Sequence, residues 1–218
     1  MSNPIHLALL ILGWALYGML HSLLASHAGK NSIMNRFPSA FRVYRLSYNL
    51  LATLLLLPPL WLLFSYPGDV LWRWPTAVRW LADIAALSAV AGLIWSSKFY
   101  DTQEFPGFRQ LSQTAPAVDD QAPMSLSPAH RFVRHPWYFF SRMIIWTREM
   151  NAAFLLTAVT LTLYLLIGSR QEEKKLVTCY GEQYRRYQAS LPGLVPRPWR
   201  YISRQQAEEI LGMDPPVK

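Results

Sequence analysis

Three long blocks of this chain contain no Asp, Glu, Lys or Arg: residues 4–25, 46–66 and 152–169. A transmembrane helix needs about 20 predominantly apolar residues. Soluble domains carry roughly 25% charged residues, whereas this chain has 16%. Apolar blocks of bilayer length that are separated by charged segments therefore predict an integral membrane protein.

The blocks also predict the fold class, which is an all-α bundle of about five transmembrane segments. Besides the blocks at 4–25 and 46–66, a third segment runs over 76–97 and holds one acid, Asp83. Within 46–66, the pair Pro58-Pro59 removes two backbone donors and is expected to kink the helix. The last two segments are a short block at 137–150 and its partner at 151–169. At about 1.5 Å per residue the short block cannot cross the membrane unaided, so the two form a hairpin, followed by cytoplasmic helices.

The distribution of the residues behind the net charge of +8 indicates how the chain is oriented in the membrane. Of the 21 Lys and Arg, 17 fall in residues 26–45, 98–135 and 170–218, and cytoplasmic loops are rich in these residues. This places the N-terminus outside and the C-terminus in the cytoplasm. A basic protein with such blocks is better explained by anionic lipid than by nucleic acid. The many Leu and aromatic residues exclude disorder, and the single cysteine, Cys179, excludes an intrachain disulfide scaffold.

The first candidate cluster is Arg134-His135-Pro136-Trp137-Tyr138. Proline suits the first helical position, so a helix is expected to begin at Pro136 with His135 as its N-cap. Backbone N–H groups at such an end attract an anion such as a carboxylate, and Arg134 strengthens that attraction. The alternative is an interfacial anchor, because Arg, Trp and Tyr are common at bilayer edges.

Two further clusters follow the last apolar block. Two adjacent acids, Glu172 and Glu173, are unfavourable at a helix C-terminus, because they meet the negative end of the helix dipole. We therefore expect the helix to continue and one acid to face a cation. The alternative is a solvated helix face. Gly181 is expected to break that helix. Tyr184 and Tyr187 share one helix face, which could stack on a planar ring or simply pack on the bundle.

The ordered set of these clusters resembles the isoprenylcysteine carboxyl methyltransferase superfamily of integral-membrane methyltransferases. The resemblance covers residues 126–198. It departs at Pro128 and His130, where the family has Gly and an aromatic residue, so the contacts of that loop are not transferred. The residues that carry the resemblance are Arg134, His135, Pro136 and Tyr138, then Glu172, Glu173 and Leu176, then Gly181, Tyr184, Tyr187 and Leu191-Pro192.

The resemblance implies S-adenosylmethionine as cofactor, held on the cytoplasmic side. Arg134, His135 and the helix N-terminus would take its carboxylate. Glu172 or Glu173 would take its ammonium group. The remaining members of the implied cofactor site are Pro136, Tyr138, Tyr184 and Tyr187, with the tyrosines bordering adenine or sulfonium.

A finer resemblance concerns the N-terminal half. The segment 20–26 (LHSLLAS), Tyr100-Asp101, Glu104-Phe105 and Gly107 look like the bacterial branch that includes methanethiol S-methyltransferases. That branch implies a bacterial inner membrane and a small thiol or lipophilic methyl acceptor, with S- or O-methylation.

Two residues are candidates for catalysis. Arg142 is a charge within an apolar block, which is costly and typical of a functional site; it could orient an anionic acceptor, or instead pair with Glu149 or snorkel. His21 lies near the cytoplasmic end of the first helix and could act as a base or donor. Its alternative is a helix–helix hydrogen bond.

The division implied for the chain is a three-helix transmembrane part at 1–98, a cytoplasmic loop at 99–130, a hairpin and cofactor-binding part at 131–200, and a tail at 201–218. Two other functions remain open. One is a membrane reductase of the sterol-reductase type with a nicotinamide cofactor, for which 218 residues leave little room. The other is a haem- or metal-binding protein, against which the absence of HxxxH and CxxC pairs argues. The expected partners are the acceptor and membrane lipids, without nucleic acid or metal.

Overall fold

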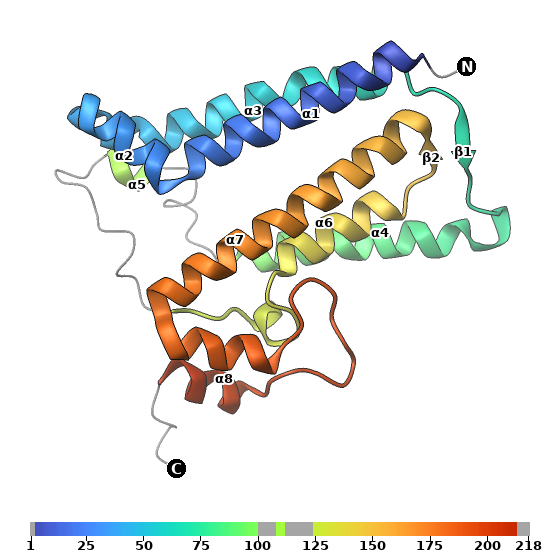
Figure 1. Cartoon of the computed structure of the whole chain (residues 1–218). Helices are drawn as coiled ribbons and strands as arrows, with labels where there is room; N and C mark the ends of the chain where they lie inside the picture. The colour runs from blue at the N-terminus through green and yellow to red at the C-terminus, as the bar shows by residue number, and fades with distance from the viewer. Residues whose placement is uncertain (1–2, 100–107, 112–123, 213–218) are drawn as a thin grey trace. The chain divides into compact units, whose positions relative to one another are not determined.

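The computed structural model describes residues 3–99, 108–111 and 124–212, which fold almost entirely into helices (Figure 1). The predicted all-α class is confirmed, whereas the motif at 100–107 lies outside the described residues. In chain order the elements are α1 (Pro4–Ala25), α2 (His27–Arg36), the 3-10 turn η1 (Pro38–Ala40), α3 (Phe41–Ser65), β1 (Val70–Trp72), α4 (Thr76–Ser97), α5 (Phe108–Leu111), the 3-10 turn η3 (Pro128–Arg131), α6 (Pro136–Trp146), β2 (Met150–Asn151), α7 (Ala152–Ser190) and α8 (Arg204–Leu211).

Four helices, α1, α3, α4 and α7, are long and apolar enough to cross a membrane. The bounds of α1 and α4 are those predicted, and α3 begins five residues earlier than its apolar block and continues through Pro58 and Pro59. Only 11–22% of the most apolar stretch of each helix is buried within the protein. Such large exposed apolar faces need lipid, so the chain is an integral membrane protein.

The short and the long helix of the predicted hairpin both differ from an ordinary span. Helix α6 has 11 residues, about 16 Å, and cannot cross the hydrocarbon core alone. Helix α7 has 39 residues, about 58 Å, which is roughly twice that core. Its apolar part ends at Ser169, so the charged part from Arg170 lies beyond the span. The predicted break at Gly181 is confirmed by a φ of 56° and ψ of −128°.

The described chain divides into two compact units, and the first contains α1, α2, α3, α5, the β1–β2 pair and α7 as far as Tyr164. Helices α1 and α3 lie side by side (Figure 1). A Cβ added at Gly13 would lie 3.5 Å from Cβ of Pro59, so glycine permits this close approach. The buried core of this unit consists of Leu10, Trp14, Leu63 and Ala153.

The second unit contains α4, η3, α6, α7 from Leu165, and α8. Helix α4 packs on α6. The core of this second unit consists of Met124, Tyr184, Tyr187, Leu191, Ile202 and Ala207. The predicted division of the chain into parts that end at residues 98, 130 and 200 stays a prediction. Within the expected tail, however, residues 204–211 form α8, whose start is stabilised by a capping box between Ser203 and Gln206.

Candidate functional site

The N-terminus of α6 forms one wall of the candidate site. His135 is the N-cap and Pro136 occupies the first turn, as the sequence predicts. The backbone N–H groups of Arg134 and His135 donate to the carbonyls of Pro192 and Gly193, at 3.0 Å each. The motif is therefore held against the turn that follows α7.

Five side chains, which we call the charge cluster, join this wall to α7: Arg134, His135, Tyr138, Glu172 and Glu173. Arg134 donates through Nε and Nη2 to Glu173 Oε1, at 2.8 and 2.7 Å. His135 Nε2 lies 3.1 Å from the same oxygen, and its Nδ1 lies 3.3 Å from Glu172 Oε2. Tyr138 donates to that Glu172 oxygen at 3.1 Å. Glu173 thus contacts both cations, whereas Glu172 contacts His135 and Tyr138.

His135 is an imidazolium in this arrangement. Each ring nitrogen faces a carboxylate, which can only accept, so both nitrogens must carry a proton. Burial alone would lower the pKa of His135, but hydrogen bonds and charge from Glu172 and Glu173 outweigh it and raise the pKa to about 9. The nearby His130 is the opposite case, since burial and the His135 charge lower its pKa to about 4.

The two acids differ in how many of their carboxylate oxygens accept hydrogen bonds within the protein. Glu173 also accepts from Nε2 of Gln188 at 2.8 Å, and its side chain is only 15% exposed. Burial would raise the pKa of Glu173, but hydrogen bonds from His135, Arg134 and Gln188 lower it to about 2. Glu172 is 46% exposed, and only its Oε2 has a hydrogen-bond partner in the described part of the chain. Its Oε1 is available to a ligand.

Arg134 is fully engaged inside the protein. Besides Glu173, its Nη1 donates to the carbonyls of Gln188 (2.9 Å) and Leu191. A Cβ added at Gly193 would lie 3.2 Å from Arg134 Nη2. The guanidinium therefore connects α6, α7 and the following turn.

The predicted aromatic face lies in the core of the second unit. Tyr184 and Tyr187 are 2% and 1% exposed. Tyr187 donates to the carbonyl of His130 at 2.8 Å, and Ser127 Oγ lies 2.7 Å from His130 Nδ1. Tyr187 thus supports the turn η3, where this chain departs from the family pattern, and Tyr184 packs in the same core.

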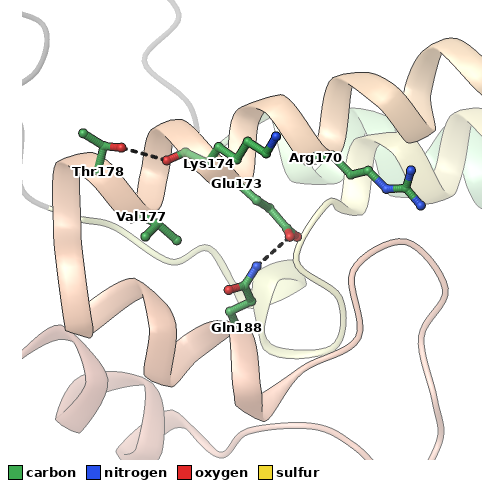
Figure 2. Close-up of a pocket in the computed structure, with 6 residues that line it drawn as sticks. All are labelled: Arg170, Glu173, Lys174, Val177, Thr178 and Gln188. Atoms are coloured by element: carbon green, nitrogen blue, oxygen red, sulfur yellow. Dashed lines mark hydrogen bonds between the residues drawn. The ribbon is translucent and has the colours of Figure 1, made fainter.

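A pocket of about 530 Å³ opens beside Glu173 (Figure 2), within the range of small-ligand sites. Three of its residues, Arg170, Lys174 and Gln188, were missed by the sequence analysis. The signal for Arg170 and Lys174 was their spacing from Glu173, at i−3 and i+1, where the apolar block ends, whereas Gln188 lies 15 residues further along α7. The lining residues are Arg170, Glu173, Lys174, Val177, Thr178 and Gln188.

Arg142 lies one helical turn beyond Tyr138, on the same face of α6. It is half-buried, and its Nε is buried without a hydrogen-bond partner among the described residues. A buried guanidinium nitrogen without a partner is costly, which is consistent with a site that receives an anion. Also among the described residues, no group of three His, Cys, Asp or Glu could hold a metal ion.

His21 lies in the first unit, within the last two turns of α1. Its Nδ1 is 2.8 Å from the hydroxyl of Tyr164 on α7, and its Nε2 is 2.8 Å from the hydroxyl of Tyr48 on α3. The predicted helix–helix hydrogen bond therefore exists twice. Both tyrosines were missed by the sequence analysis, because nothing in their local pattern marks them.

Several curated proteins are similar to this chain over most of its length. It is 31% identical over 207 residues to a methanethiol S-methyltransferase of Pseudomonas deceptionensis, covering 89% of this chain and 74% of that protein. It is 31% identical over 195 residues to methanethiol S-methyltransferase 2 of Bradyrhizobium diazoefficiens, covering 84% and 70%. A methanethiol S-methyltransferase of Mycobacterium tuberculosis is 30% identical over 204 residues, covering 88% and 78%. No family profile and no solved structure matches the chain.

Proposed function

This chain belongs to the methanethiol S-methyltransferase family, and we propose that it transfers a methyl group from S-adenosylmethionine to a small thiol. Family membership makes it a membrane methyltransferase. The identity of the donor and of the acceptor is our proposal. The observation that supports it best is the charge cluster, in which Glu172 keeps one carboxylate oxygen without a hydrogen-bond partner in the described residues, while its neighbour Glu173 lines a pocket.

The residues of the charge cluster fit the amino-acid end of such a cofactor. Glu172 Oε1, exposed and without a partner in the described chain, can accept from an ammonium group. The N-terminus of α6 at Pro136 attracts a carboxylate, and Arg170 and Lys174 add positive charge along the pocket. When bound, S-adenosylmethionine supplies a methyl group on a positively charged sulfur.

The other proposed cofactor residues have supporting tasks. Arg134 and Glu173 neutralise each other and hold His135 in place. His135 and Tyr138 each contact Glu172 and so orient its carboxylate. Tyr184 and Tyr187 hold the core under Gln188 and Leu191, which in turn anchor Arg134.

Methyl transfer to a thiol needs an aligned nucleophile and the exclusion of water more than acid catalysis. We assign Arg142 to the acceptor, because its partly buried guanidinium can hold a thiolate at the depth of the membrane. We assign His21 to removal of the acceptor's proton. The apolar surroundings suit a small lipophilic thiol that enters from the bilayer.

The proposed location is a bacterial inner membrane, with the N-terminus outside and the site on the cytoplasmic side. The 17 Lys and Arg on one side support this orientation. Reporter fusions at Ser190 and at the N-terminus test it, because a periplasmic signal at Ser190 would reverse the topology.

The test of function is an assay in membranes that contain this chain, with methyl-labelled S-adenosylmethionine and methanethiol. We expect labelled dimethyl sulfide in the headspace, and its loss in Glu172→Gln. A parallel panel with a prenylated carboxylate and a lipid amine asks whether another acceptor is preferred. Labelled product from the panel but not from the thiol would overturn the assignment of a thiol as the acceptor. Binding of NADPH in place of S-adenosylhomocysteine, or a Soret band, would overturn the methyltransferase activity itself.

A further inference from the structure

The segment that joins α7 to α8, residues 192–202, is a closed loop that we call the aromatic loop. At its start, the carbonyls of Pro192 and Gly193 accept from the backbone just before α6, at 3.0 Å each. At its end, the N–H of Ile202 donates to the carbonyl of Arg131 at 3.0 Å. Both ends are therefore fixed to the residues that precede α6, and the loop bends back towards the start of that helix (Figure 1). We propose that the aromatic loop binds the surface of an anionic lipid bilayer.

The loop presents large apolar side chains that the protein itself leaves uncovered. Trp199 is 76% exposed, more than any other large apolar side chain in the described part of the chain. Tyr201 is exposed as well, and its ring stacks on that of the exposed Phe132, with 6.2 Å between the centroids. Val195 adds a fourth exposed apolar side chain. Exposed apolar groups that gather in one place mark an interaction surface, and Trp and Tyr favour the border between bilayer and water.

The charge of the loop complements an anionic surface. Residues 183–207 contain five arginines and no Asp or Glu. Arg200 donates to the carbonyl of Ala189 and is held against the protein. The side chain of Arg197, beside the exposed tryptophan, is exposed and makes no ion pair with the described residues. Arginines next to apolar side chains at a membrane surface attract anionic lipid head groups.

The loop lies at the level where the apolar helices of the second unit end. Helix α4 is long and apolar enough to cross a membrane, and it packs on α6. The apolar part of α7 ends at Ser169, and Glu173, one turn further on, contacts Arg134 and His135 just before α6. The aromatic loop is hydrogen-bonded to these same two residues, so it lies beside the border between bilayer and water. The nearest large apolar phase at this level is the bilayer, which favours lipid over a protein partner.

The tip of the loop is already in a defined conformation without lipid. The N–H of Arg200 donates to the carbonyl of Arg197 at 2.9 Å, which closes a four-residue turn. Pro198 occupies the second position of this turn, where its fixed φ is favourable, and Trp199 occupies the third. Pro196 restricts the strand that leads into the turn. A surface that is ordered before it binds loses little conformational entropy on binding.

The single cysteine of the chain makes the proposal simple to test by fluorescence. Cys179→Ser removes it, and Trp199→Cys in that background carries one environment-sensitive label at the tip of the loop. The full chain is reconstituted into phosphatidylcholine bilayers with or without phosphatidylglycerol. We expect quenching by a lipid with a nitroxide near its head group, and less by one with a nitroxide at the end of its acyl chain. The control is the same label on the exposed Cys179 of the wild-type chain, about 15 Å along α7 from Ser169, which should stay unquenched.

A second comparison tests the charge. Arg197→Gln, added to the labelled chain, should lower the ratio of bound to free loop about fivefold in bilayers that contain phosphatidylglycerol. In pure phosphatidylcholine the same substitution should change little. Added salt should reduce the difference between the two bilayers, because it screens exposed charges. Arg185→Gln is the matched control, since it removes an equally exposed arginine from α7, outside the loop, and should leave the ratio unchanged.

A label at the loop tip that neither spin-labelled lipid quenches in either bilayer would overturn the proposal. A blue-shifted label without quenching would overturn it too, because a protein surface, such as a second copy of this chain, would then cover the loop. Equal losses in Arg197→Gln and Arg185→Gln would refute a charge contact by the loop. Circular dichroism verifies that each labelled chain is folded, and Val195→Cys provides a second label position in the loop. No methyl acceptor enters the test, so its outcome is independent of the proposed function.

Discussion

Replacing Glu173 with Gln tests the division of labour between the two adjacent acids. The variant keeps the shape of the side chain but removes the charge that faces Arg134 and His135. The pKa of Glu173 is held at about 2 against an ordinary 4.5. At about 1.4 kcal/mol per pKa unit, this depression corresponds to a stabilisation of about 3 kcal/mol near neutral pH. The loss of one partner from a buried ion pair has a similar cost.

The assay is thermal unfolding of the detergent-solubilised protein, followed by circular dichroism. For a chain of this length 1 kcal/mol shifts Tm by about 2–4 °C, so Glu173→Gln should lower Tm by about 9 °C. The neighbouring Glu172→Gln is the matched control. Because its side chain is 46% exposed, solvent screens its charge and we expect a much smaller change in Tm.

The sign of the pH dependence follows from the direction of the pKa shift. A depressed carboxyl pKa contributes stability above the unfolded value, near 4.5, and the contribution disappears as pH falls towards 2. The difference in Tm between the wild-type protein and Glu173→Gln should therefore shrink in acid. Equal Tm values for Glu172→Gln and Glu173→Gln at pH 7 would refute the assignment of Glu173 as the structural acid.

Because the raised pKa of His135 contributes stability below pH 6.5 that is lost as pH rises through about 9, Tm should fall over that range in the wild-type protein but not in His135→Gln. Arg142→Met should lower turnover while calorimetry shows S-adenosylhomocysteine binding nearly unchanged; lost cofactor binding would place Arg142 in the cofactor site. Gly92→Ala should destabilise by about 1–3 kcal/mol, because its Cβ would lie 2.6 Å from the ring of Phe140, whereas Gly168→Ala, with its nearest contact at 3.9 Å, should leave Tm unchanged.

Much of the fold was predictable from local sequence. A long apolar block must remain helical in lipid, because only a helix satisfies its backbone groups within one segment; this is why the bounds of α1 and α4 agree with their apolar blocks. Helix α8 was missed because it is short and polar, and only the pair Ser203 and Gln206 marked its start.

The candidate site was predictable as a set of residues but not as a set of tasks. Arg134, His135, Glu172 and Glu173 were expected to meet a ligand, and the structure brings them together. That Arg134 is engaged by carbonyls of Gln188 and Leu191 depends on how α7 and the next turn fold back on α6. No spacing within the motif carries that information.

The sequence by itself determined the membrane class, the helical segments and the motif residues, because bilayer length and helix-end chemistry act within about 20 neighbouring residues. Only the tertiary structure decided which acid is saturated and which is available. It also decided that His21 meets Tyr48 and Tyr164, the latter 143 residues away. Hydrogen bonds act over about 3 Å, so the tasks of these polar groups follow from distances that only the packed helices create.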